Sequence, residues 1–252
     1  MAKNASLVRL DALLVKRGMA GSRQRAQEMI RAGDVTVDGL VAKKPATQVR
    51  SNQAIELTNK DFPWVGRGAL KLLGVLSPFH IQPDQKVCAD LGSSTGGFTQ
   101  VLLENGATKV YAIDVGKGQL AWKLRTDPRV VVMEETNARH LESLPEPIDL
   151  VVGDLSFISL RLILPAVKRL MRKDGDAVLL IKPQFEAGKH AIKKGGKVAS
   201  ETVRTETIES VLEAAQHLGF LVVQGTDCTV PGAKAGNVEY FVHLRAQNTH
   251  EK

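Results

Sequence analysis

The chain has 252 residues, of which 43% are hydrophobic and 24% are charged, with a formal net charge of +7. This length fits one large domain or a small domain joined to a medium one, and the composition is typical of a soluble globular protein. No apolar run reaches the roughly 18 to 20 residues that a membrane-spanning helix needs. Charged side chains interrupt the first twenty residues, so we expect no signal peptide and a cytoplasmic location.

The cysteines and histidines do not form a metal-binding pattern. Cys88 and Cys228 lie far apart in the sequence, and no histidines have the spacing of metal ligands. We therefore expect two reduced, buried thiols and no metal site.

The positive charge is concentrated at the N-terminus. Residues 1–60 contain eleven Lys and Arg against five Asp and Glu, whereas residues 61–252 contain 23 against 22. Such an asymmetry favours binding of a polyanion, because neutralising phosphates releases counterions. A solvated surface without a partner is the alternative that charge alone leaves open.

The first sixty residues show the pattern of a compact α+β unit. Val8, Leu10, Leu13 and Leu14 have helical spacing, and Gly18 can end that helix. A second helix is predicted from an N-cap at Ser22 to a C-cap at Gly33. The alternating stretch 35–37, a turn at Asp38-Gly39 and the apolar pair 40–41 predict a hairpin.

The run from Ser22 to Ala26 and the run from Ile30 to Gly39 resemble the S4-type RNA-binding domain. The resemblance implies that this domain, residues 1–60, presents its helices and the following turn to structured RNA. Basic residues on its polar positions, with two more beyond it, are the expected RNA contacts: Arg9, Arg23, Arg25, Arg31, Lys43, Lys44, Arg67 and Lys189.

Residues 59–66 are predicted to form a linker, residues 67–246 a second domain and residues 247–252 a tail. In the second domain apolar strand-like runs alternate with helical patterns, such as Phe98–Glu104, Leu160–Met171 and Thr202–Leu218. This alternation predicts an α/β fold with a seven-stranded, mostly parallel sheet between helices. The expected strands are Val87–Leu91, Val110–Asp114, Val130–Met133, Leu150–Gly153, Val178–Lys182, Phe220–Val223 and Tyr240–Leu244.

A turn rich in Gly and Ser follows the first of these strands, in Cys88-Ala-Asp-Leu-Gly-Ser-Ser-Thr-Gly-Gly-Phe98. It matches neither the G-x-G-x-x-G dinucleotide fingerprint nor a P-loop. The remaining pattern, D-x-G-x-x-x-G, resembles motif I of the Rossmann-like class I methyltransferases, and an ordinary turn between strand and helix is the alternative. The resemblance implies S-adenosylmethionine as cofactor, bound by Asp90, Gly92, Ser93, Ser94, Thr95, Gly96, Gly97 and Phe98.

Two further residues extend this prediction. Asp114 ends the next strand, 22 residues after Gly92, a spacing that suits a hydrogen bond to the ribose of adenosine. Asn137 follows the third strand, where the family has another cofactor contact. For Asn137, a simple turn-forming role is equally compatible with the sequence.

Methylation of a hydroxyl requires a group that removes its proton or stabilises the developing alkoxide. Lys71, Asp154, Lys182 and Glu239 stand in sequence contexts that resemble the Lys-Asp-Lys-Glu tetrad of the FtsJ-type ribose 2′-O-methyltransferases. The resemblance implies that Lys182 activates the 2′-hydroxyl, that Asp154 and Glu239 position it, and that Lys71 completes the network. Asp154 would also border the cofactor. Five segments further resemble the TlyA (haemolysin A) family: Ser94–Phe98, Gln119–Arg125, Phe157–Leu160, Lys182–Phe185 and Gly236–Glu239.

The similarity to the TlyA family runs from about residue 7 to residue 244. Its departures are small, since Gly66 replaces a usual Ser and Ala69 a usual Gly, and neither removes a charged group. The family implies 2′-O-methylation of cytidine in ribosomal RNA, in the small subunit, the large subunit or both. The nucleotide, the state of the substrate as naked RNA or assembled subunit, and the oligomeric state stay open.

Two features beside the tetrad are less specific. The basic, glycine-rich loop 186–197 is predicted to be a flap that closes on RNA, with a plain exposed loop as the alternative. Phe157 and Phe185 flank the tetrad and could frame the target nucleotide, although burial in the core is the interpretation that the sequence favours.

Two other functions remain to be weighed. A membrane-active haemolysin is suggested by the family's second name, but the sequence shows no export signal and no long amphipathic basic helix. A non-catalytic RNA-binding factor for ribosome assembly is the other alternative, and the intact set of four charged residues argues against it.

Overall fold

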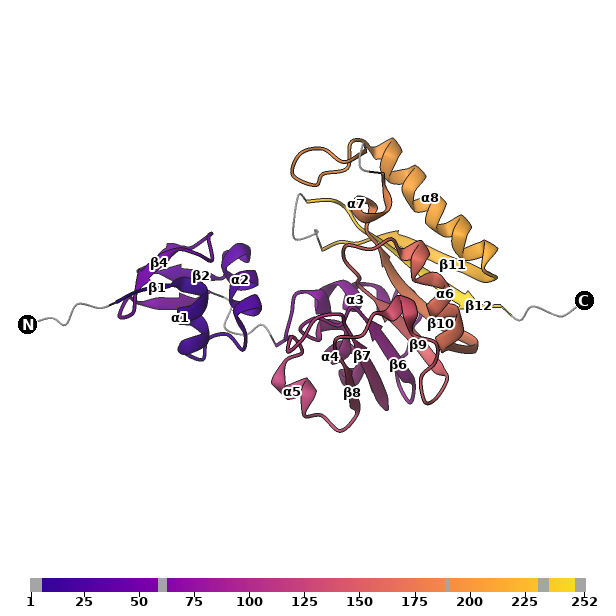
Figure 1. Cartoon of the computed structure of the whole chain (residues 1–252), viewed down its shortest axis with the longest axis horizontal. Helices are drawn as coiled ribbons and strands as arrows, with labels where there is room; N and C mark the ends of the chain where they lie inside the picture. Colours follow the sequence, from indigo (N-terminus) through magenta and orange to yellow (C-terminus); the bar gives the residue numbers. More distant parts are fainter. Residues whose placement is uncertain (1–5, 59–62, 189–190, 231–235, 248–252) are drawn as a thin grey trace, which may run out of the picture. The chain divides into compact units, whose positions relative to one another are not determined.

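The computed structural model describes residues 6–58, 63–188, 191–230 and 236–247. They belong to two compact units, Met1–Gly66 with Ala121–Lys123 and Arg67–Leu120 with Leu124–Lys252 (Figure 1). Lys189, one of the predicted RNA contacts, lies outside the described residues, and so does most of the predicted tail.

The first unit is a small α+β fold. Its core is formed by apolar side chains of both helices and of the strands, including Leu10, Leu14, Ala26 and Ile30. Its elements are β1 (Leu7–Arg9), α1 (Leu10–Lys16), α2 (Arg23–Ala32), β2 (Val35–Val37), β3 (Leu40–Val41), β4 (Gln48–Arg50) and β5 (Ile55–Leu57). β1 pairs with β4, and β2 lies between β3 and β5, all antiparallel.

The two predicted ends of α2 are confirmed. The Ser22 hydroxyl accepts a hydrogen bond from Arg25 N at 3.1 Å, and Gly33 has a left-handed φ of 84°. Val8 was predicted to belong to the first helix, but it lies in β1, where it pairs with Val49. The pairing with β4 is a long-range interaction, and it overrides the helical spacing of the local sequence.

The second unit contains the predicted seven-stranded sheet, in the order β11-β12-β10-β9-β6-β7-β8. Only β12 runs against the others, so the sheet is mostly parallel. The strands are β6 (Val87–Leu91), β7 (Lys109–Ile113), β8 (Val130–Met133), β9 (Ile148–Gly153), β10 (Met171–Ile181), β11 (Phe220–Asp227) and β12 (Tyr240–Ala246).

Two of the predicted helices, Phe98–Glu104 and Thr202–Leu218, are confirmed to within one residue at each end, as α4 (Gly97–Glu104) and α8 (Glu201–His217). The unit also contains α3 (Gly68–Leu76), α5 (Trp122–Arg125), α6 (Leu164–Leu170) and α7 (Pro183–Glu186). The helix predicted over Leu160–Met171 is divided into a 3-10 turn, Leu160–Leu162, and α6. Pro165 explains the break, because proline lacks a backbone donor and is tolerated only in the first turn of a helix.

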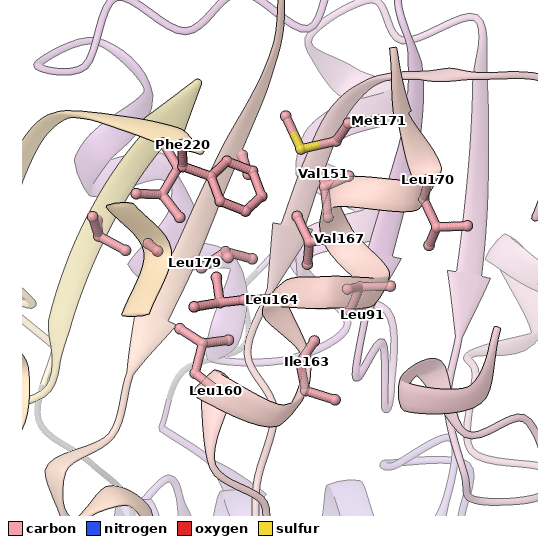
Figure 2. Packing of buried hydrophobic residues seen from close by; sticks show 14 of the residues in the cluster. Leu91, Val151, Leu160, Ile163, Leu164, Val167, Leu170, Met171, Leu179 and Phe220 are labelled. Atoms are coloured by element: carbon pink, nitrogen blue, oxygen red, sulfur yellow. The ribbon is translucent and has the colours of Figure 1, made fainter. Parts of the chain in front are cut away.

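Helices cover both faces of the sheet. α6 and α8 pack on one face, where Leu160, Leu164 and Val167 meet Val151, Leu179 and Phe220 (Figure 2). On the other face Phe98 of α4 stacks on Phe241 of β12, with ring centroids 6.3 Å apart. Adjacent residues of β12 point to opposite faces of the sheet. Val242 therefore packs in the cluster under α6 and α8, whereas Phe241 packs against α4 on the other face.

The topology gathers four segments at one edge of the sheet. The glycine-rich turn, Asp154 and Lys182 directly follow β6, β9 and β10, which are parallel. β12 is antiparallel to β10, and Tyr240 pairs with Ile181, so the residue before β12 reaches the same edge. Ligands of such folds bind at the carboxyl ends of the parallel strands.

Candidate active site

The glycine-rich turn is fixed against the neighbouring strands. Gly92 N and Ser93 N donate to Ile113 O at 2.8 and 3.1 Å. Gly92 has a φ of +80°, and a Cβ at this position would lie 3.1 Å from Asp154 O, so only glycine fits without strain. Gly96, with a φ of +95°, is the N-cap of α4. The turn therefore brings its backbone close to Asp154, the residue that follows β9.

Asp90 offers a buried acceptor in β6, two residues before this turn begins. Its Oδ2 accepts hydrogen bonds from Thr99 N at 2.9 Å and Thr99 Oγ1 at 2.7 Å. Its Oδ1 is buried and has no partner among the described residues. Burial raises the pKa of Asp90 to about 7, although the bonds from Thr99 oppose the shift. A buried acceptor without a donor fits a ligand that carries an ammonium or amino group.

Asp114 lies at the end of β7, beside the same turn. Its carboxylate accepts hydrogen bonds from Ser94 N at 2.8 Å and Gly116 N at 2.7 Å. Each carboxylate oxygen has a second lone-pair site and can accept a further bond from a ribose hydroxyl. The buried acceptor of Asp90 and the partly exposed carboxylate of Asp114 together suit S-adenosylmethionine.

Glu134 was not predicted from the sequence, yet it orders the loop that follows Asp114. It accepts hydrogen bonds from Gly118 N, Gln119 N and Leu120 N at 2.7, 2.8 and 3.2 Å. These bonds and the ion pair to Arg125 outweigh burial, so the pKa of Glu134 lies near 2. Its position directly after β8 is the sequence signal that could have indicated it.

Asn137 caps a 3-10 helix. Its side-chain oxygen accepts a hydrogen bond from Arg139 N at 3.0 Å and so begins the turn Ala138–His140. This is the turn-forming role that the sequence left open. A contact with the cofactor through its remaining donors stays a prediction.

The four charged residues predicted as a tetrad form one ion-pair network. Lys71 Nζ lies 3.1 Å from Asp154 Oδ2 and 2.7 Å from Glu239 Oε2. Lys182 Nζ lies 2.5 Å from Asp154 Oδ1. The order Glu239–Lys71–Asp154–Lys182 alternates in charge and joins α3 to three adjacent strands of the sheet.

The network is largely withdrawn from water, and this affects the pKa of its members. Burial alone would raise the pKa of Asp154, but the ammonium groups of Lys71 and Lys182 outweigh it and hold that pKa below its usual range. Burial would lower the pKa of Lys71, but the carboxylates of Asp154 and Glu239 keep it above its usual range. Lys71 is therefore a protonated cation shared by two carboxylates.

Ser156 is a member of this site that the prediction missed. Lys182 Nζ donates to Ser156 Oγ at 2.8 Å, in addition to its ion pair with Asp154. Ser156 follows Asp154 by two residues, and that position at the end of β9 could have indicated it. The pair of contacts fixes the direction of the Lys182 side chain.

Phe157 is not part of the core, so the interpretation that favoured burial is wrong for this residue. Its side chain is 82% exposed and its φ is +65°, a conformation that non-glycine residues rarely adopt. Its ring centroid lies 5.1 Å from that of Phe185, whose ring lies beneath Lys182 Nζ at 5.9 Å. An exposed aromatic ring with a strained backbone beside charged groups is typical of a ligand contact.

The basic residues of the first unit fall into two groups. Arg9 and Arg23 pair with the buried Asp11 at 2.8 and 3.3 Å, so both have a structural role there. Lys43 and Lys44 are exposed and have no ion pair within the described part of the chain.

The remaining predicted RNA contacts show intermediate situations. Arg25 lies 3.6 Å from Glu28, and Arg31 donates to Gln27 at 3.2 Å. In the second unit, Arg67 is partly exposed and immediately precedes α3.

Fold and site together define a class of protein. A seven-stranded sheet with one antiparallel strand, a glycine-rich turn after β6 and an acid after β7 form the Rossmann-like fold of S-adenosylmethionine-dependent methyltransferases.

Comparison with known proteins specifies this class further. The model of the FtsJ-like methyltransferase family matches residues 64–246, and that of the S4 domain matches residues 8–55. The chain is 51% identical to the 16S/23S rRNA (cytidine-2′-O)-methyltransferase TlyA of Mycobacterium tuberculosis, over 96% of this chain and 91% of that protein.

Two further relatives have a different name. Hemolysin A of Brachyspira hyodysenteriae is 38% identical, over 94% of this chain and 99% of that protein. A solved structure from Streptococcus thermophilus, named as a hemolysin, is 37% identical with a TM-score of 0.76, and the match covers 98% of this chain and 90% of that one.

The chain belongs to the FtsJ-like methyltransferase family and carries an S4 domain ahead of the methyltransferase domain. Its methyl donor is S-adenosylmethionine.

Proposed function

We propose that the protein is a ribosomal RNA 2′-O-methyltransferase that acts on cytidine and uses Lys71, Asp154, Lys182 and Glu239 as its catalytic residues. The observation that carries the proposal is the ion-pair network of these four residues at the edge of the sheet beside the glycine-rich turn. The name of the Mycobacterium tuberculosis relative, 51% identical, supports the substrate.

The two lysines have different environments, and this suggests different roles. Lys71 is shared between Asp154 and Glu239, which keeps its pKa above the usual range, so it stays a cation. Lys182 has one carboxylate partner and lies at the end of β10, next to the exposed Phe157 and the partly buried Phe185. Lys182 Nζ is therefore the group that, after losing its own ammonium proton to solvent, takes the proton of the ribose 2′-hydroxyl as the hydroxyl oxygen attacks the methyl group.

The other residues prepare this proton transfer. Asp154 and Ser156 hold Lys182 Nζ in place, and Glu239 holds Lys71 against Asp154. Phe157 offers a face on which the target base can stack. S-adenosylmethionine, held by Asp90, Asp114 and the glycine-rich turn, supplies a methyl group that is electrophilic because it is bonded to a sulfonium. Positioning and fixed charges then provide most of the acceleration.

The first unit is proposed to anchor the RNA through the S4 domain. Most of the excess positive charge of the chain lies there, which supports a sequence-independent contact with phosphates. Ribosomal RNA or ribosomal subunits are then the partners, and the cytoplasm is the expected location.

The second name of the relatives raises the alternative of a membrane-active haemolysin. Within the described residues, no helix is long and apolar enough to span a bilayer. The ion-pair network has no role in membrane lysis, so it favours the methyltransferase over the haemolysin.

Mapping of 2′-O-methyl groups in ribosomal RNA tests the proposal. RNA from a strain without the gene is incubated with purified protein and S-adenosylmethionine, and then compared with RNA treated with Lys182→Ala. We expect new 2′-O-methylcytidine only with the unmodified protein. An RNA that gains no 2′-O-methyl group, either naked or in isolated subunits, contradicts the proposed function.

A further inference from the structure

A basic hairpin lies beside the segment that carries Glu239. Ile192 and Val198 form an antiparallel bridge, and Lys193 N donates to Lys197 O at 2.8 Å to close the turn. The hairpin carries three exposed lysines, Lys193, Lys194 and Lys197. None of them forms an ion pair with an acidic side chain among the described residues. Unpaired, solvated ammonium groups so close together suit contacts with RNA phosphates.

Asn237 attaches this hairpin to the rest of the unit. Its side-chain oxygen accepts a hydrogen bond from Val198 N at 3.0 Å, and its Nδ2 donates to Gly196 O at 2.8 Å. The residue is only 6% exposed, so the amide is buried with both of its ends used. A buried polar side chain that satisfies two backbone groups of another segment fixes that segment strongly.

The two residues that follow Asn237 make equally specific contacts. Val238 O accepts a hydrogen bond from Arg204 Nε of α8 at 3.2 Å. Glu239 O accepts one from Cys228 N at 2.8 Å, while the Glu239 carboxylate pairs with Lys71. Three consecutive residues thus join the hairpin, α8 and the ion-pair network.

We infer that Asn237 is a positioning residue, which couples phosphate contacts of the hairpin lysines to the placement of Glu239 and Lys71. This inference rests on the proposed function, since it requires RNA as the substrate. Asn237 touches neither the RNA nor the cofactor in this scheme. Its amide holds the hairpin in a fixed position relative to the segment that carries Glu239. RNA bound by the hairpin lysines is therefore placed at a defined position relative to the ion-pair network.

A double-mutant cycle in the full-length protein tests the coupling. One side of the cycle is Asn237→Ala, and the other is the triple change of Lys193, Lys194 and Lys197 to Ala. The measured quantities are the affinity for total ribosomal RNA at several salt concentrations and the single-turnover rate of methyl transfer. Asn105→Ala is the matched control, because among the described residues its side-chain amide donates only to Val101 O, one turn back in α4.

In the unmodified background we expect the triple change to lower the slope of log affinity against log salt by about 0.7 to 0.9 for each lysine that contacts a phosphate. Asn237→Ala should give the same change in slope, and a rate lower by about 10-fold to 100-fold. In the Asn237→Ala background the triple lysine change should cause little further loss of salt slope or of methyl-transfer rate. The affinity for S-adenosylmethionine should stay the same in every variant.

Asn237→Asp covers the case in which Asn237→Ala does not fold. It keeps the acceptor for Val198 N but turns the donor towards Gly196 O into a second acceptor, so an intermediate loss of slope and rate is expected. Additive effects in the cycle, or an unchanged slope in Asn237→Ala and Asn237→Asp, overturn the inference. Failure of the proposed function is recognised separately, because the unmodified protein would then transfer no methyl group to the RNA.

Discussion

Lys71 and Glu239 are 168 residues apart in the chain, yet Lys71 Nζ lies 2.7 Å from Glu239 Oε2. They meet because β12 runs antiparallel to β10, which brings the residue before β12 to the edge where β9 and β10 end. The same Nζ is 3.1 Å from Asp154 Oδ2, so one cation holds two carboxylates.

Lys182→Ala should greatly lower the rate of the methyl-transfer step. Loss of a general base typically lowers the rate by roughly 10² to 10⁴. RNA and cofactor affinity should change much less, because the residue acts mainly in the transition state. Lys182→Arg should not restore activity, since a guanidinium stays protonated. Single-turnover methyl transfer to ribosomal RNA measures this, and near-normal turnover in Lys182→Ala would show that the tetrad is assigned wrongly.

Lys71→Met should destabilise the fold, most strongly near neutral pH, where Asp154 and Glu239 are ionised. Removing one partner of a buried ion pair costs about 3 to 5 kcal/mol, because the remaining charges lose their compensation. The pKa of Asp154 is depressed, so its contribution is present above the usual aspartate pKa and is lost as pH falls through the lowered value.

In Lys71→Met the pKa of Asp154 should rise, because one of its two ammonium partners is gone. The free energy of unfolding that the variant has lost should therefore shrink as the pH falls and Asp154 becomes protonated. Chemical unfolding followed by circular dichroism at several pH values from neutral to acid measures this difference. Lys109→Met is the control, because its ion pair to Glu146 is much more exposed. Equal stability of Lys71→Met and the unmodified protein at neutral pH would contradict the stabilising role of the network.

Cofactor affinity should depend on the ionisation of Asp90. Burial raises the pKa of Asp90 to about 7, and a cationic donor at Oδ1 would favour the ionised form. Affinity for S-adenosylmethionine should therefore weaken as pH falls below about 7 and level off above it. Calorimetry between pH 5.5 and about 8.5 tests this, with proton uptake or release read from buffers of different ionisation enthalpy. In Asp90→Asn the pH dependence should vanish, and its persistence there would assign it to another group.

The basic residues of the first unit should separate into two kinds. Lys43→Ala with Lys44→Ala should weaken RNA binding and lower its salt slope by up to about 0.7 to 0.9 per lysine, with no loss of stability. Arg9→Ala should instead lower stability, because the buried Asp11 loses its 2.8 Å partner. Filter binding at several salt concentrations and thermal unfolding distinguish the two. An Arg9→Ala protein of unchanged stability would argue that Arg9 is free for RNA.

Phe157→Ala should weaken the interaction with the target nucleotide. Stacking of a base on an aromatic ring contributes about 1 to 3 kcal/mol, whereas the removal of an exposed ring costs the fold little. Phe157→Trp should keep most of the activity because it retains an aromatic face. Steady-state kinetics with ribosomal RNA should show the loss in kcat/KM, with thermal stability unchanged. A marked loss of stability in Phe157→Ala would indicate a packing role.

The order of elements was predictable because it depends on local sequence. Hydrophobic periodicity indicated the seven strands of the second unit and both helices of the first, and Ser22 and Gly33 mark the ends of α2 as expected. The glycine-rich turn was recognisable because Gly92 and Gly96 adopt positive φ values that favour glycine. The identity of the four charged residues came from family resemblance, since nothing in their local spacing relates Lys71 to Glu239.

Only the tertiary structure decided which side chains meet. Strand order and the reversal of β12 placed Glu239 against Lys71, and pairing with β4 drew Val8 out of a helix. Arg9 and Arg23 are predicted RNA contacts, and the structure adds that both pair with the buried Asp11. The exposure of Phe157 and the two bonds of Asn237 likewise depend on neighbours far along the chain. Local sequence determines backbone preference and periodicity, whereas burial and ion pairing are set by contacts that form only when the sheet assembles.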